Sequence, residues 1–596
     1  YETRPVPEEP LGQIDLSYGR FQTIRGHLYD GRQNDWGGFV VEGIHLGTQG
    51  FKTLQTDFGR DNTGFQKSEF SFKGFVNNKR DSHAFNRLTV KFVGSRENSN
   101  ETYVGLSDAD FREDPYQRYA GSQLDNMSWW RTAVSLRHDL AVGEHVIVET
   151  TAYRHDFDRT WERANRFGSD NAGFVPFIDV VTFPNTPPTD AFFPVLTGAR
   201  DSVSVTNPSD QSQNIRVISN RRRFVVMGIQ SRFRADFDTG RVHHEIESGV
   251  RFHYDSADRF QPEQSYAMQN TQLVWDGVTY VENPDLLITD NKGEAAALAG
   301  YLAYGIEVAR LVVKPGVRVE YIQTYFTDDK NAPDLGRVKE DPQLVLLPGI
   351  GIQYTVFDGF AVLAGAHRGF SAVAPGNAGD VDPELSINYE AGFRYVSKDG
   401  LGFGELIGFF NDYSNIVSLC TASTGCPTGE IGRQFNGGRA FIGGVEALGG
   451  YNIPLPRLLN MPVRVSYTYT NAQYRSTFDA GPIVGEVSPG DPINFVPPHL
   501  LNTQLGLEKS FWGAYLNGTY VSPFPEGIVG LSGTESLPKT DGYFVLDLVG
   551  RIRFEPVEAY VRLQNITNTR AIVSRRPFGA RPNAPFSFQV GVQVTF

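Results

Sequence analysis

The feature that most constrains this sequence is a strict alternation of apolar and polar side chains, clearest at the carboxyl end. Between 586 and 596 the even positions are all apolar: Phe586, Phe588, Val590, Val592, Val594 and Phe596. The positions between them are polar or small: Ser587, Gln589, Gly591, Gln593 and Thr595. A period of two predicts a β-strand with one apolar and one polar face. A soluble β-sandwich could also contain one such strand, so the fold class depends on whether the alternation recurs along the chain.

The same alternation recurs along the chain, in 87–92, 463–470, 544–554 and 557–564. Charged residues alternate with apolar ones, as Glu558 does between Val557 and Ala559 and Arg562 does between Val561 and Leu563. In a barrel the apolar face can meet lipid and the polar face a wet lumen. No apolar run approaches the roughly 20 residues of a membrane-spanning helix, which excludes a helical membrane protein.

The connections between the predicted strands are of two lengths. Short ones are 140–144, 238–240, 357–359, 398–400 and 555–556, and long ones are 98–126, 158–220, 256–292, 417–433, 472–497 and 523–540. We expect short and long connections to alternate strictly, which is the layout of an outer-membrane barrel with short periplasmic turns and long extracellular loops. The fold class is therefore all-β, a transmembrane antiparallel β-barrel of about 22 strands. An even number of strands predicts that both termini are periplasmic.

Two further features bear on partners and compartment. The net charge of −13 argues against a nucleic-acid partner. The only cysteines, Cys420 and Cys426, lie in a Gly/Thr/Ser/Pro-rich segment. They are either free thiols or, as we favour, a disulfide in a loop outside the cell. A metal site is less favoured because 419–433 contains no His.

The size of such a barrel raises a question about its interior. Strands about 4.8 Å apart and tilted by about 40° give a barrel roughly 40 Å across, which side chains cannot fill. Barrels of this size are normally plugged. We expect 1–10 to be a junction and 11–596 the barrel, which leaves nothing for a plug.

Several stretches together resemble the barrel of TonB-dependent outer-membrane transporters over essentially the full length. They are 1–21, 367–371, 382–395, 438–446, 563–568 and the final Phe596. The stretch 101–111, with Pro115 and Arg118-Tyr119 after it, is similar to the branch that handles ferric citrate-type substrates. The resemblance implies an outer-membrane iron transporter for a siderophore or ferric citrate, energised by the TonB complex through an amino-terminal plug domain. No cofactor is implied. The plug is expected as a separate polypeptide, as a segment cut away, or beyond the given sequence.

By the same resemblance, an anionic ferric chelate would be bound by Arg, Tyr and His facing the upper lumen. The candidates for ligand binding are His367, Arg368, Arg433, Arg439, Arg575, Arg576, Arg581, Arg163 and Arg166, the last two in the longest predicted loop. The alternative for each is a structural pair with an Asp or Glu of the wall.

Other chemistry is weakly supported. His243 and His244 point to opposite faces of a strand, so they cannot share a metal. The acidic stretch 108–114 could hold a cation or be solvated. No nucleophile and base are paired by the sequence, so we predict no enzyme and no catalytic residues. The alternatives to a transporter are a large passive pore, an outer-membrane hydrolase, or a barrel scaffold that binds another protein.

Overall fold

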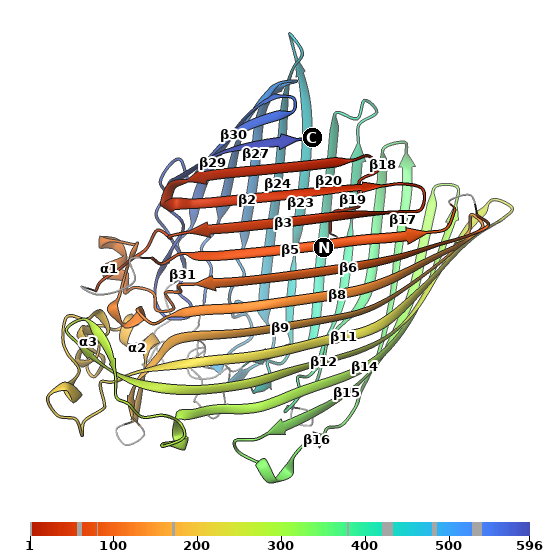
Figure 1. Cartoon of the computed structure of the whole chain (residues 1–596). Coiled ribbons are helices and arrows are strands. Elements are labelled where there is room, and N and C mark those ends of the chain that lie inside the picture. Colours follow the sequence, from red (N-terminus) through yellow and green to blue (C-terminus); the bar gives the residue numbers. More distant parts are fainter. Residues whose placement is uncertain are drawn as a thin grey trace.

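The chain forms one closed antiparallel barrel in the computed structural model, which describes residues 3–56, 62–79, 82–169, 173–377, 381–419, 433–479, 486–526 and 539–596 (Figure 1). Twenty-two strands form the wall. The last strand pairs with the first, with Ile14 opposite Val594 and Tyr18 opposite Val590. This seam closes the barrel, and the predicted fold class, an antiparallel β-barrel of about 22 strands, is confirmed.

The strands of the wall follow one another in chain order. They are β1 (Leu11–Gly19), β2 (Thr23–Gln33), β3 (Gly37–Thr48), β5 (Phe65–Asn77), β6 (Ala84–Ser99), β8 (Asn126–Val142), β9 (Val146–Ser169), β11 (Ile215–Thr239), β12 (Val242–Gln269), β14 (Leu287–Val308), β15 (Leu311–Asp328), β17 (Gln343–Phe357), β18 (Phe360–Ser371), β19 (Glu384–Val396), β20 (Gly402–Asn415), β23 (Ala440–Leu455), β24 (Leu459–Tyr474), β27 (His499–Lys509), β28 (Trp512–Val521), β29 (Tyr543–Phe554), β30 (Val557–Gln564) and β33 (Ser587–Thr595).

Shorter elements lie between them. Three extend the wall locally: β10 (Gly173–Pro176), β13 (Gln272–Trp275) and β16 (Val338–Lys339). The loops contain β4 (Thr53–Leu54), β7 (Gln117–Arg118), β21 (Val417–Leu419), β22 (Gln434–Asn436), β25 (Phe478–Asp479), β26 (Glu486–Val487), β31 (Ile572–Ser574) and β32 (Arg581–Pro582). The helices are α1 (Asp108–Glu113), α2 (Phe177–Thr182), α3 (Phe193–Thr197), and the 3-10 turns η1 (Arg20–Gln22), η2 (Ala120–Ser122), η3 (Thr189–Ala191), η4 (Val203–Val205), η5 (Pro284–Leu286) and η6 (Pro333–Leu335).

The apolar positions of the wall face outward. On β33, Phe588, Val590 and Val592 are exposed, as are Leu16 and Tyr18 on β1. This is the arrangement of a barrel surrounded by lipid, with its polar rows inside. No α-helix in the described ranges has the length and hydropathy needed to cross a membrane.

The inner face carries the polar rows. The Tyr560 hydroxyl donates to Asp15 across the seam at 2.7 Å, and Asp15 also accepts from Arg25. The segment 3–10 also contacts the inner wall, because Lys73 Nζ donates to the carbonyl oxygens of Thr3 and Arg4 at 3.0 and 2.8 Å. That this segment is a junction to another domain stays a prediction.

The two ends of the barrel differ in their connections. One, here the turn end, has tight turns such as 143–145, 240–241, 309–310, 358–359 and 555–556. The other, here the loop end, carries the long loops and α1–α3 (Figure 1). Strict alternation of short and long connections was wrong at the start of the barrel. The β1–β2 connection at the loop end is only η1, with 3 residues, and the next connection, 34–36, is also short.

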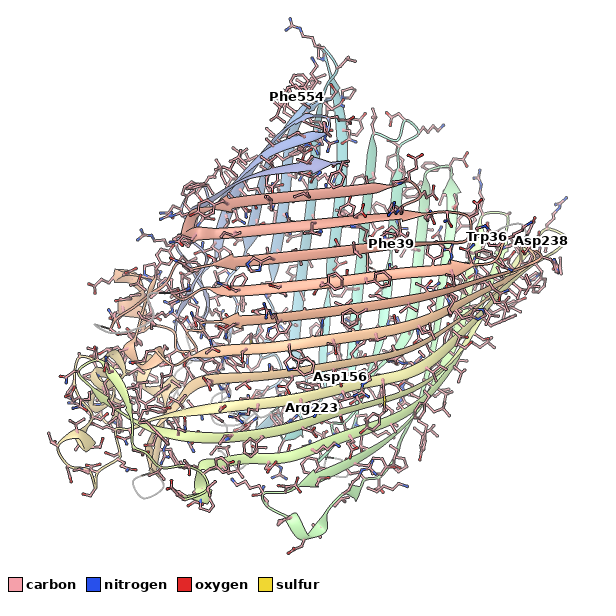
Figure 2. All side chains as sticks on the ribbon, in the orientation of Figure 1. Trp36, Phe39, Asp156, Arg223, Asp238 and Phe554 are labelled. Carbon is pink, nitrogen blue, oxygen red and sulfur yellow. The ribbon has the colours of Figure 1, made fainter. Side chains whose placement is uncertain are left out.

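Four neighbouring strands are the longest of the wall. β9, β11, β12 and β14 have 24, 25, 28 and 22 residues, whereas about 9–11 residues cross a bilayer. The predicted loops 158–220 and 256–292 were therefore too long, because these strands continue into both. Their outward positions become charged, as at Asp156 and Arg223 (Figure 2), so the alternation disappears from the sequence while the pairing of β9 with β11 continues.

The main hydrophobic core lies at the loop end, outside the wall proper. It joins the third loop (100–125), the fourth loop (173–214), the ends of β9, β11 and β12, and the last loop (565–586). Val104 forms a β-bridge with Phe578, and Leu106 forms one with Ala580. We call this packed unit the loop cap. It holds segments that are remote in sequence in fixed positions over one side of the mouth.

Candidate functional site

Three arginines lie side by side on the inner wall near the loop end. Arg222 of β11 is directly opposite Arg159 of β9 and Arg259 of β12. Since Met227 and Ile229 mark the exposed outward row of β11, Arg222 belongs to the inward row, and Arg223 points outward. Cross-strand partners share a face, so all three guanidinium groups belong to the interior. We call this set, with Arg163, the arginine row.

The arginine row lacks compensating charge. The guanidinium of Arg222 is repelled by those of Arg259, Arg159 and Arg163. Its Nε donates to the neutral Asn220 Oδ1 at 3.1 Å. Within the described ranges no carboxylate pairs with any of the four. Like charges opposite one another destabilise a sheet. The row therefore favours an anion that would enter the mouth.

Arg163 connects the row to the loop cap. Its guanidinium lies 4.6 Å from the ring centre of Tyr103 and 5.2 Å from that of Trp161, and it donates to the Tyr103 hydroxyl. The two rings meet edge to face, with centres 5.2 Å apart. Cation–π contacts hold the charge without neutralising it. These contacts fix the position of Arg163 without giving it a carboxylate partner in the described chain.

More cations converge on the neighbouring segment of the third loop. Arg581 donates to the Tyr103 carbonyl oxygen, and Lys52 Nζ donates to Thr102 Oγ1 at 2.9 Å. Desolvation, reinforced by Arg118 and Arg581, lowers the pKa of Lys52 to about 7. Burial and then Arg581 lower the pKa of Arg118 to about 9. Arg118 and Arg581 thus extend the positive charge from the wall into the loop cap, whereas Lys52 is only partly protonated near pH 7.

Asp125 is the buried carboxylate of this region. Its oxygens accept from the backbone N–H groups of Tyr103 and Ala164, both at 2.7 Å. Burial raises the pKa of Asp125 to about 7, although these hydrogen bonds act in the opposite direction. Asp125 therefore ties the third loop to β9 and does not neutralise the arginine row.

Two of the arginines predicted from the sequence lie close together, and two others form bonds that connect loops. Arg163 and Arg581 meet on Tyr103. Arg575 forms an ion pair with Asp108, and Arg576 donates to the Glu526 carbonyl oxygen at 3.0 Å. These two bonds join the last loop to its neighbours.

Arg166 also has a structural environment. It pairs with the buried Glu263 at 2.7 Å and lies 3.5 Å from the ring centre of Phe174. Arg163 and Arg166 were predicted in a loop, and that placement was wrong, because both lie in β9. Whether any of these arginines binds ligand stays a prediction.

The remaining candidates are spread around the rim. His367 is opposite Gly349 and Asn388 on the inward row of β18. Arg368 lies on the outward row beside the exposed Ile387 and donates to the Leu346 carbonyl oxygen at 3.3 Å. Arg433 and Arg439 are exposed in the connection that contains the cysteines. Cys420 and Cys426, the predicted disulfide, lie outside the described residues.

The sequence reasoning missed Arg159, Arg222 and Arg259. Their one signal is register, which places them in a line across three strands. Because 158–220 and 256–292 were taken for loops, Arg159 and Arg259 were not placed on strands, and their register with Arg222 could not be predicted.

No metal site is built from the side chains that the structure describes, where no group of three His, Cys, Asp or Glu could hold an ion. The acidic stretch 108–114 is used for contacts instead: Asp108 pairs with Arg575, and Asp110 accepts from the Tyr119 hydroxyl at 2.6 Å.

A closed antiparallel barrel of 22 strands with outward apolar rows has the architecture of a bacterial outer-membrane barrel. The model of the TonB dependent receptor-like β-barrel family matches residues 150–567, most of the chain, and the chain belongs to that family. Receptors, not enzymes, make up this family, which agrees with the expectation of a non-enzyme.

Solved structures share the fold at low sequence identity. The unliganded ferric citrate transporter FecA is 17% identical with a TM-score of 0.72, covering 100% of this chain and 80% of its own. The siderophore receptor PiuA from Acinetobacter baumannii is 11% identical with a TM-score of 0.73, covering 100% and 82%. The ferric-catecholate import receptor Fiu from E. coli K12, in its closed form, is 13% identical with a TM-score of 0.70, covering 100% and 83%.

Proposed function

We propose that this barrel takes up an anionic ferric chelate, a siderophore or ferric citrate-like complex, across the outer membrane. The arginine row and the adjoining cations of the loop cap bind the chelate at the mouth. The loop end then faces the outside of the cell, and both termini are periplasmic. The observation that carries the proposal is the direct register of Arg159, Arg222 and Arg259 without an opposing carboxylate in the described chain.

The chemistry of the row suits such a ligand. A guanidinium presents a planar fork that matches the oxygens of a carboxylate or a similar anion. Several guanidinium groups on the wall of a recessed mouth also raise the local concentration of an anion. The chain as a whole carries a net charge of −13, so this positive region is local. The similar structures are named a ferric citrate transporter, a ferric-catecholate import receptor and a siderophore receptor, and these names support the same substrate class.

The family supports the remaining parts of the proposal. Membership of a TonB-dependent family implies energy from the TonB complex, delivered through a plug domain. Outer-membrane lipid would surround the outward apolar rows. Binding at the mouth would come first, and the energised step would admit the chelate to the lumen.

Binding of ferric chelates to the purified protein tests the proposal. A panel of ferric citrate, a ferric catecholate and a ferric hydroxamate is titrated against the wild type, Arg222→Gln and the control Arg394→Gln. Arg394 is also an inward arginine, but it pairs with Glu405 near the turn end at 2.5 Å. Arg222→Gln should weaken binding about tenfold or more, the value of one charge-assisted hydrogen bond, and the control should not.

Two outcomes would count against the proposal. One is a protein that binds no ferric chelate while it conducts ions freely in a planar bilayer, which would favour a passive pore. The other is equal loss of binding in both variants, which would mean that the row has no special part in recognition.

A further inference from the structure

A second recess lies at the loop end, away from the arginine row. It is a cavity of about 480 Å³ beside the barrel seam. It is lined by Arg20, Phe21, Phe51, Tyr116, Ile566, Asn568, Arg570, Pro585 and Phe586. None of these residues belongs to β9, β11 or β12. We call this cavity the seam pocket.

The seam pocket exists because the first loop is so short. Phe21 and Gln22 take the left-handed backbone conformation, with φ of 61° and 51°, which turns the chain at once into β2. Longer loops flank this low point and supply the other walls. The Phe51 ring lies 6.0 Å from Phe21 and meets Tyr116 edge to face at 5.7 Å between centres. The result is an aromatic recess at a low point of the rim.

The pocket also carries uncompensated positive charge. Arg20 lies 4.6 Å from the Phe21 ring centre and donates to the Phe586 carbonyl oxygen at 2.6 Å. Arg570 lies 5.9 Å from the Tyr116 ring centre. Neither arginine pairs with a carboxylate of the described chain. The Tyr116 hydroxyl is buried and meets no hydrogen-bond partner there. Two guanidinium groups and one phenol thus have donors to spare.

The position of the pocket relates it to the membrane. Arg20 follows Tyr18 by two residues, and Tyr18 is 58% exposed on the outward row of β1. Phe586 precedes the outward-facing Phe588 by two residues at the same end of β33. The pocket therefore lies where the outward apolar rows end. In a membrane barrel this is the level of the lipid headgroups, where aromatic side chains gather.

We propose that the seam pocket binds the phosphorylated sugar headgroup of an outer-leaflet glycolipid. Arg20 and Arg570 hold the phosphate with charge-assisted hydrogen bonds. The rings of Phe21 and Phe51 pack against the apolar face of the sugar, and the Tyr116 hydroxyl donates to a sugar or phosphate oxygen. The cavity has the size of a small-ligand site. This inference is independent of the ferric chelate, because it uses none of the arginine row.

Lipid retention by the purified full chain tests the inference. The protein in detergent is mixed with a bis-phosphorylated lipid A, the same lipid A without phosphates, or phosphatidylglycerol, and bound lipid is measured by native mass spectrometry. We expect a preference of about tenfold or more for the phosphorylated glycolipid over the dephosphorylated one. The double variant Arg20→Gln/Arg570→Gln should lose that preference.

The matched control is Arg223→Gln, an exposed outward arginine of β11 beyond the pocket (Figure 2), which should keep the preference. Arg570→Lys keeps the charge without the fork and should give an intermediate result. Heat-dependent mobility on a gel confirms that each variant is folded, and Tyr116→Phe gives a milder second probe.

Three results would overturn the inference. They are equal retention of phosphorylated and dephosphorylated lipid A, equal losses in the pocket variant and Arg223→Gln, and full competition by glucosamine 6-phosphate. The last would identify a soluble sugar phosphate as the occupant in place of a lipid.

Discussion

Arginines point into the lumen at both ends of the barrel, but the charges around them differ between the two ends. Near the turn end, Arg234 pairs with Glu245 at 3.2 Å, Arg394 with Glu405 at 2.5 Å and Arg553 with Glu558 at 2.8 Å. Near the loop end, Arg222 faces other arginines. Each turn-end pair links two adjacent strands on the lumen side of the wall, whereas the arginines of the row repel one another across adjacent strands.

The contrast separates stabilisation from recognition. An exposed ion pair contributes about 0–1 kcal/mol, so the turn-end pairs give a modest and local benefit. A line of like charges lowers stability and breaks the pattern of opposite charges that the three turn-end pairs follow. Sequences that specify a fold break such rules mainly at functional sites. The environment of an arginine, more than its presence, therefore indicates which end of the barrel meets the ligand.

The sharpest effect on stability should come from a third environment, the buried pair. Arg166→Ala leaves Glu263, whose side chain is 1% exposed, without its cation. Breaking a buried pair in this way costs about 3–5 kcal/mol. Urea unfolding, or proteolysis of the loop cap, should show the loss. Arg166→Ala combined with Glu263→Leu should recover much of it, and failure to recover would mean that Arg166 stabilises β9 by other contacts.

The comparison is tested most directly by ligand affinity. Arg222→Ala with Arg259→Ala removes two of the row and should weaken ferric chelate binding about 100-fold, from two charge-assisted hydrogen bonds. The paired control, Arg394→Ala with Arg553→Ala, should change affinity less than twofold. Raising the salt concentration should weaken wild-type binding far more than that of the row variant, because screening acts on the charge that the variant lacks. Similar salt dependence would contradict the assignment.

The loop cap should respond to pH in two directions. The pKa of Asp125 is raised to about 7, so the folded form holds a proton that the unfolded chain releases, and stability falls as pH rises from about 4 to 7. The pKa of Lys52 is lowered to about 7, so the unfolded chain holds the extra proton, and stability rises from about 7 to 10. The cap should be least stable near pH 7.

Hydrogen exchange of the third loop at several pH values measures this profile. Asp125→Asn should flatten the acidic side, and Lys52→Met should flatten the basic side. A maximum of protection at neutral pH would show that other groups dominate.

The sequence predicted the wall better than the mouth. The alternation in 586–596 led to β33 and its outward row, because period two depends on local geometry alone. It failed where outward positions are no longer apolar, as at Asp156 of β9, since a strand beyond the membrane needs no apolar row. The arginine row was not predicted for the same reason, because it depends on the register between strands that the alternation did not reveal. Arg163 and Arg581 were found by residue type, but their meeting on Tyr103 depends on tertiary packing.

The smallest expected effect has the clearest sign. Arg222→Gln relieves repulsion within the row and should raise the free energy of unfolding of the ligand-free protein by about 0.2–1 kcal/mol. Arg394→Gln removes a partner from Glu405 and should lower it by a similar amount. Both changes remove one positive charge from the inner wall, so net charge cannot explain opposite signs. Urea titrations of the two variants side by side measure the change in the free energy of unfolding. Changes of the same sign would mean that an inward arginine has the same effect on stability at both ends of the barrel.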